Sequence, residues 1–137
     1  MKVQELMTTL VESIAPTKSL KQAARKMAQS NVGFLPIVED GKLLGTITDR
    51  DITCYAVAIG RSPDETEVQR CMTRDVITCF EDQDINEAAH LMEERHIRRL
   101  PILHRDNTLA GILTVDDLAR GSHDLAGAVL EAATPIH

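Results

Sequence analysis

Apolar residues return at helical spacing in two segments of the chain. Within each segment they occupy positions i, i+3, i+4 and i+7, which places them on one face of a helix. Ser19 precedes the first segment and is followed three residues later by Gln22, an arrangement typical of a capping box. Asp84 and Glu87 stand in the equivalent places at the second segment. The apolar positions are Leu20, Ala23, Ala24, Met27 and Ala28 in the first, and Ile85, Ala88, Ala89 and Met92 in the second.

Two pairs of short apolar runs predict two β-hairpins. Each pair surrounds a turn, Asp40-Gly41 in the first and 105–107 in the second, and an Asp-Gly turn between apolar runs is a strong hairpin signal. Pro36 and Pro101 cannot donate a ladder hydrogen bond, so we expect each at a strand edge or a bend. The runs are 34–38 with 42–48, and 99–103 with 109–114.

A shorter helix is predicted after each hairpin. The first follows Thr48 and ends at Gly60, and the second follows Thr114 and ends at Gly121, because glycine commonly ends a helix. Each half then has the order β-α-β-β-α, and the fold class is α/β. Residues 125–133 add a weak terminal helix.

The elements repeat because the sequence repeats. A motif at the start of the chain returns 65 positions later, from Val3 to Val68, and the motif around Pro36 returns at the same interval around Pro101. Order, spacing and residue type recur together, which indicates a duplicated structural unit. The paired motifs are V-Q-x-x-M-T at 3–8 and 68–73, L-P-I at 35–37 and 100–102, and G-x-h-T-x-x-D-h (h apolar) at 45–52 and 111–118.

Length and composition fit one duplicated domain. A chain of 137 residues is normally a single compact body. With 43% hydrophobic but only 2% aromatic residues, its core is expected to consist of aliphatic side chains. We predict one repeat at 1–62, a second at 63–122, and a C-terminal tail with a short helix at 123–137.

Charge and cysteine content narrow the class of protein. The net charge of −6 and the pI near 5.3 argue against nucleic acid or an anionic membrane as the main partner, because both attract clustered Lys and Arg. Three cysteines without a C-x-x-C pair favour reduced thiols and a cytoplasmic protein. The first residues show no apolar run of signal-peptide length, and no stretch approaches the ~20 apolar residues of a membrane span.

Taken together, the tandem motifs resemble the cystathionine-β-synthase (CBS) domain pair, also called a Bateman module, over residues 3–121. The resemblance implies two repeats related by pseudo-two-fold symmetry and packed through their sheets into one compact module. It also implies two clefts that commonly bind adenosine-containing ligands such as AMP, ADP, ATP, NAD or S-adenosylmethionine. CBS pairs usually associate into flat dimers, so a homodimer is expected.

The resemblance further implies which residues line the clefts. In the family, the Asp of T-x-x-D accepts hydrogen bonds from ribose hydroxyls and the Thr lies beside the ribose or phosphate. A carboxylate suits that task because it is an acceptor-only group that can take both hydroxyls of a diol. The first cleft would contain Thr48, Asp51, Ile77, Thr78, Arg98 and Arg99, and the second Val11, Ser13, Gly33, Phe34, Thr114 and Asp117. Arg50, where the second repeat has Asp116, could either reach a phosphate in the first cleft or be exposed to solvent.

The two predicted clefts differ in charge. Arg98 and Arg99 precede L-P in the second repeat, where two guanidinium groups could hold a phosphate. Gly33 and Phe34 occupy the same positions in the first repeat and carry no charge. We therefore expect a phosphorylated nucleotide to prefer the first cleft, the one that contains Asp51.

Other interpretations stay open for these residues. The Thr and Asp of each T-x-x-D could serve only as helix N-caps, and the arginines could be a solvated pair. The protein would then be a ligand-free scaffold for dimerisation or for an unidentified protein partner.

No catalytic motif is present, so we expect a regulatory protein and not an enzyme. The histidines share no ligand-like spacing with the cysteines, and no metal site is predicted. A redox- or metal-linked stress protein that uses Cys54, Cys71 or Cys79 is the weakest alternative.

Overall fold

The computed structural model describes residues 1–133 and divides the chain into two compact units. Unit 1 consists of Met1–Val11 together with the chain from Ile77 onward, and unit 2 consists of Glu12–Val76. Each unit has its own core of buried aliphatic side chains, as the composition predicted. Unit 2 is built around Leu20, Leu35 and Ile47, and unit 1 around Met92 and Leu100.

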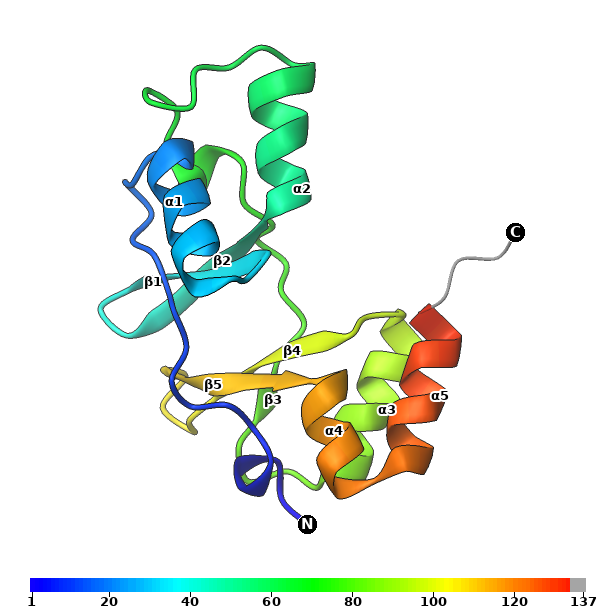
Figure 1. Ribbon diagram of the computed structural model, residues 1–137. Helices are drawn as coiled ribbons and strands as arrows, with labels where there is room; N and C mark the ends of the chain where they lie inside the picture. The colour runs from blue at the N-terminus through cyan, green and yellow to red at the C-terminus, as the bar shows by residue number, and fades with distance from the viewer. Residues whose placement is uncertain (134–137) are drawn as a thin grey trace. The chain divides into compact units, whose positions relative to one another are not determined.

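In unit 2 the helix α1 packs against a β-hairpin, and a second helical segment after the hairpin adds partly buried side chains to the same core (Figure 1). The hairpin turn places Asp40 and Gly41 at φ of 53° and 79°, the left-handed conformation that a tight Asp-Gly turn requires. Ser19 and Gln22 form the predicted capping box at the start of α1. The elements are α1 (Leu20–Ser30), β1 (Phe34–Glu39), β2 (Lys42–Thr48), α2 (Asp49–Ile52), the π-helix η2 (Thr53–Ala58) and the 3-10 helix η3 (Val68–Arg70).

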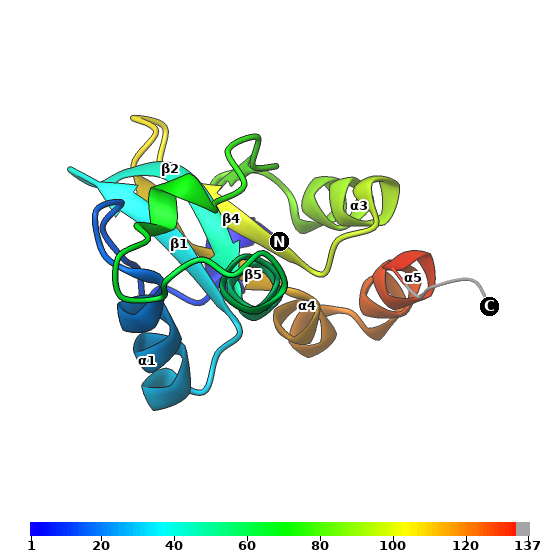
Figure 2. The ribbon, with the colours of Figure 1, turned by 90° about the horizontal axis from the view of Figure 1, so that it is seen from above.

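Unit 1 repeats this plan and adds a terminal helix. Its hairpin β4–β5 carries a short parallel strand, β3, so that the sheet order is β3-β4-β5. Helix α5 packs against α3 and α4 and contributes Ala126 and Val129 to the core (Figures 1 and 2). The elements are η1 (Val3–Glu5), β3 (Cys79–Phe80), α3 (Ile85–Arg95), β4 (Arg99–Leu103), β5 (Leu109–Thr114), α4 (Val115–Gly121) and α5 (His123–Ala133).

Each hairpin is extended by the M-T segment of the other sequence repeat. Thr73 pairs with Thr46 beside β2 in unit 2, and Thr8 pairs with Ile112 beside β5 in unit 1. The compact units are therefore offset from the sequence repeats, whose boundaries at 1–62, 63–122 and 123–137 stay a prediction. The segment Arg61 to Glu67 belongs to unit 2, where Glu67 forms an antiparallel β-bridge with Ser19.

Close packing at these bridges explains the glycine of each G-x-h-T motif. A Cβ at Gly45 would lie 2.6 Å from the carbonyl oxygen of Thr73, and a Cβ at Gly111 would lie 2.5 Å from that of Thr8. Both distances are shorter than carbon and oxygen tolerate, so the M-T segment can approach only a residue without a side chain.

Two local predictions were wrong. Pro101 was expected at a strand edge or a bend, but it lies within β4, the central strand of its sheet. The proline fits because its opposite residue, Ile112, directs its own N–H to Thr8, so this position of the β4–β5 ladder needs no donor. Glu87 was expected to complete a capping box, but it accepts a hydrogen bond from the Gln83 side chain at 2.8 Å.

The strand predicted before the first helix of each repeat, in the order β-α-β-β-α, is short. In unit 2 it is a single bridge between Ile14 and Ile37, and in unit 1 it is the two-residue strand β3. None of the helices within residues 1–133 has the length and apolar character that a bilayer crossing requires.

Candidate functional site

The Thr48–Asp51 pair begins α2 and forms what we call the Asp51 box. The Thr48 N–H donates to Asp51 Oδ2 at 2.9 Å, and the Asp51 N–H donates to Thr48 Oγ1 at 3.1 Å. The spacing of T-x-x-D therefore has a local cause, because the N-cap residue and the third helical residue satisfy each other's backbone N–H. Asp51 is half-buried, and its Oδ1 accepts no hydrogen bond from any residue in the range 1–133.

The Thr114–Asp117 pair forms the same arrangement at the start of α4, here called the Asp117 box. The Thr114 N–H donates to Asp117 Oδ2 at 2.9 Å, and the Asp117 N–H donates to Thr114 Oγ1 at 3.2 Å. The surroundings differ, however, because Asp117 is only 2% exposed. The helix-capping interpretation is thus confirmed for both boxes, and it leaves open whether either carboxylate also meets a ligand.

Asp117 has two further partners that the sequence interpretation missed. Thr8 Oγ1 donates to Asp117 Oδ1 at 3.2 Å, and Arg120 Nη2 forms an ion pair with the same oxygen. Arg120 Nη2 also lies 3.4 Å from the carbonyl oxygen of Leu6. Arg120 could have been suspected from its position three residues after Asp117, where helical geometry favours an ion pair. Thr8 belongs to the M-T motif, but only the path of the chain brings it to Asp117.

The helices that follow the two boxes also differ. After Asp51 the chain continues as the π-helix η2, whereas α4 is a regular α-helix over its seven residues. The predicted end of the first helix at Gly60 is confirmed, since Gly60 has φ of 81° after the C-cap residue Ile59. Short π-helical segments are frequent at functional sites, because they reposition side chains relative to a regular helix.

The two residues that precede each L-P motif lie next to the Thr–Asp box of the same unit. In unit 1, Arg99 is opposite Thr114 in the β4–β5 ladder, and the Arg98 carbonyl accepts from the Val115 N–H at 2.9 Å. Both arginines are exposed. Within this unit the basic pair therefore adjoins the Asp117 box.

In unit 2, Phe34 is opposite Thr48, and the Gly33 carbonyl accepts from the Asp49 N–H at 2.9 Å. A Cβ at Gly33 would lie 2.8 Å from Asp49 Oδ2, so a larger residue would displace that carboxylate. The uncharged pair thus adjoins the Asp51 box in a tight backbone arrangement.

The remaining predicted residues lie outside the strands, in the segments that precede β1 and β3 and on α2. Ile77 and Thr78 are half-buried immediately before β3, and Arg50 is exposed on α2. Val11 closes the N-terminal segment of unit 1, and the carbonyl of Ser13 in unit 2 accepts from Lys26 Nζ. Each predicted cleft contains residues of both units, so the assignment of these residues to two clefts stays a prediction.

The cysteines do not form a metal or disulfide site in the described part of the chain. Cys54 is exposed, while Cys71 and Cys79 are buried and free. Burial raises the pKa of the Cys71 and Cys79 thiols, which keeps them protonated and weakly nucleophilic. No group of three or more potential metal ligands occurs within residues 1–133.

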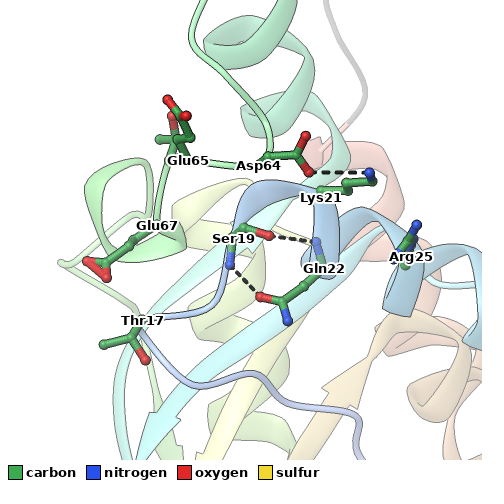
Figure 3. Close-up of a pocket in the computed structure, with 9 residues that line it drawn as sticks. Thr17, Ser19, Lys21, Gln22, Arg25, Asp64, Glu65 and Glu67 are labelled. Carbon is green, nitrogen blue, oxygen red and sulfur yellow. Dashed lines mark hydrogen bonds and ion pairs between the residues drawn. The ribbon is translucent and has the colours of Figure 1, made fainter.

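A separate hollow of about 520 Å³ lies at the start of α1 in unit 2 (Figure 3). Its charged groups are partly engaged, since Lys21 Nζ pairs with Asp64 at 3.3 Å and the Ser19–Gln22 box occupies the helix start. None of the predicted ligand-binding residues lines it. The lining residues are Thr17, Ser19, Lys21, Gln22, Arg25, Asp64, Glu65, Thr66 and Glu67.

Comparison with known proteins decides the family. The model of the CBS domain family matches residues 3–57 and again residues 67–124. The chain belongs to the CBS domain family. The CBS domain-containing protein YhcV of Bacillus subtilis is 38% identical over 130 residues, which cover 93% of this chain and 91% of that protein. The family resemblance inferred from the tandem motifs is confirmed.

Solved CBS structures confirm the mixed α/β fold of two repeats. The CBS domain pair of protein MJ0100, solved in complex with 5-methylthioadenosine and S-adenosyl-L-methionine, is 30% identical with a TM-score of 0.75, and covers 88% of this chain and 94% of that chain. CBSX2 in complex with AMP is 25% identical with a TM-score of 0.76, and covers 88% and 93% of the two chains. Both of these CBS proteins hold adenosine derivatives.

Proposed function

We propose that this CBS protein is a regulatory module that binds an adenosine-containing ligand and holds its ribose hydroxyls at Asp51. The observation that carries the proposal is the state of the Asp51 carboxylate. One oxygen completes the capping box, and the other accepts no hydrogen bond within residues 1–133. A fixed carboxylate with one open oxygen suits a sugar diol, because its hydrogen bonds are charge-assisted.

Relatives and neighbouring residues support the choice of ligand. Two similar CBS proteins were solved with AMP and with S-adenosyl-L-methionine and 5-methylthioadenosine, so the adenosine group is the common chemistry. The exposed guanidinium groups of Arg98 and Arg99 are suited to phosphate, with Thr48, Arg50, Ile77 and Thr78 completing the proposed contacts. The second predicted contact set, Val11, Ser13, Gly33, Phe34, Thr114 and Asp117, is expected to bind such a ligand too weakly to count as a second site, because Asp117 already has partners in the protein.

Regulation requires the ligand to prefer one of two states of the protein. The proposed readout is a homodimer or a complex with a protein partner, whose population changes by a coupling free energy of ~1–3 kcal/mol. The CBS matches at 3–57 and 67–124 take up most of the chain, which supports a regulatory role over catalysis.

The first test is a thermal-shift screen with AMP, ADP, ATP, NAD and S-adenosylmethionine. At 100 times its dissociation constant, a ligand of the native state stabilises the fold by ~2.7 kcal/mol. A flat response to the whole panel would contradict ligand binding and favour the ligand-free scaffold.

The second test assigns the carboxylate by calorimetry with AMP and S-adenosylmethionine. Asp51→Asn keeps an oxygen for the helix cap but removes the charge, and should weaken binding about tenfold or more. Asp117→Asn is the matched control and should leave affinity within about twofold. Equal losses, or a loss confined to Asp117→Asn, would overturn the assignment.

A further inference from the structure

The second carboxylate of the repeat is already satisfied by the protein itself. Asp117 Oδ2 accepts from the Thr114 N–H at 2.9 Å, and Asp117 Oδ1 accepts from Thr8 Oγ1 at 3.2 Å and pairs with Arg120 Nη2. A carboxylate offers about four lone-pair positions, so three donors leave little capacity for a diol. Only 2% of Asp117 is exposed, which also leaves little room for a ligand hydroxyl.

Arg120 is held in place by more than one contact. Its Nη2 atom donates to Asp117 and lies 3.4 Å from the carbonyl oxygen of Leu6, so the guanidinium joins α4 to the N-terminal segment of unit 1. The arginine side chain is itself 61% exposed. The cation therefore covers the carboxylate from the solvent side.

The first repeat lacks this cover. The residue 66 positions before Arg120 is Cys54, which is exposed, uncharged and too short to serve as a substitute. Thr73 is the counterpart of Thr8, but no hydrogen bond joins it to Asp51 within residues 1–133. The difference between the two boxes thus lies in residues that the G-x-h-T-x-x-D-h motif does not include.

We propose that Arg120 is a specificity-determining residue that occupies Asp117 as an internal cation and restricts the protein to one adenosine ligand per chain. This rests on the proposed function, because the restriction concerns the same class of ligand. The exchange of Arg120 for an uncharged residue opens the second carboxylate. An arginine at position 54, three residues after Asp51, brings a cation within reach of the first carboxylate, although it stands on the π-helix η2 and not on a regular α-helix.

Calorimetry with AMP and S-adenosylmethionine as probes tests the proposal on the full chain. The wild type should bind about one molecule per chain, and Arg120→Ala should bind about two. The added event should disappear in the double variant Arg120→Ala with Asp117→Asn. The reciprocal variant, Cys54→Arg, should weaken binding to the wild-type site by about tenfold.

The outcomes separate this inference from the proposed function. Two molecules bound by the wild type, or one bound by folded Arg120→Ala, would overturn the inference and leave ligand binding at Asp51 intact. Binding by Arg120→Ala alone would support the inference and overturn the role of Asp51. If no variant binds either probe, both fail. If circular dichroism shows that Arg120→Ala does not fold, the Cys54→Arg variant is the deciding test. Unchanged affinity of Cys54→Arg for both probes would overturn the inference.

Discussion

The Asp51 and Asp117 boxes share one backbone design and differ in everything around it. Both carboxylates cap a helix by accepting the N–H of a threonine three residues earlier, at 2.9 Å in each case. Asp51 Oδ1 then has no hydrogen-bond donor among residues 1–133, while Asp117 is buried and has Thr8 and Arg120 as further partners. Duplication has therefore preserved the helix-capping role of the motif, while the number of further donors that reach each carboxylate depends on residues outside it.

The largest expected effect is on stability and separates the two boxes. Asp117→Ala removes the acceptor of Thr114, Thr8 and Arg120, and should cost about 3 kcal/mol of unfolding free energy. That value is at the low end for a broken buried ion pair, because Arg120 is 61% exposed. Asp51→Ala removes only a cap and should cost about 1 kcal/mol. Urea unfolding followed by circular dichroism measures both, and equal costs would remove the distinction.

A second pair of substitutions should affect the two units alike. Gly45→Ala and Gly111→Ala place a methyl group within 2.6 Å and 2.5 Å of a carbonyl oxygen, and each should destabilise the protein by about 2 kcal/mol. Gly127→Ala in α5 is the control, since its Cβ would meet no atom within 4 Å. It should stabilise by about 0.5–1 kcal/mol, because alanine favours a helix. Neutral behaviour of either hairpin glycine in thermal or urea unfolding would contradict the close approach of the M-T segment.

A smaller effect is expected on binding, through the charge difference between the repeats. The double substitution Arg98→Ala and Arg99→Ala should weaken AMP binding by about tenfold, which corresponds to one lost charge-assisted bond. Adenosine, which has no phosphate, should bind unchanged. Arg95→Ala removes a positive charge from an exposed position at the end of α3 and serves as the control. If AMP and adenosine lose affinity equally, the arginines do not act on the phosphate.

Local signals made most of the secondary structure predictable. The apolar spacing, the Ser19–Gln22 box and the Asp40-Gly41 turn each depend on residues within a few positions, and the helices, the box and the turn are confirmed. Two residues of the predicted apolar face, Ala24 and Ala28, are exposed. The T-x-x-D boxes were also predictable as helix caps, because both hydrogen bonds lie within four residues. The difference between the hydrogen-bond partners of Asp51 and those of Asp117 was only partly predictable.

What the sequence could not reveal depends on distant parts of the chain. The partner of Asp117, Thr8, is 109 positions away and reaches it only because the first residues pack into unit 1. The predicted position of Pro101 failed for a related reason, since the short strand β3 pairs with β4 and makes it the central strand of the sheet. Periodicity reports which face of an element is buried, but it does not report which segment covers that face.

The pairing of Thr73 with Thr46 has a practical consequence for dissecting this protein. A fragment that follows the sequence repeat and stops at residue 62 would keep β1 and β2 but lose the segment that covers the outer edge of β2. The Thr46 N–H and carbonyl would then be unpaired on an open strand edge, and such edges recruit other chains. A fragment of residues 12–76 keeps that edge covered and is one continuous chain. Unit 1 consists of two segments, Met1–Val11 and the chain from Ile77 onward, which a linker would have to join.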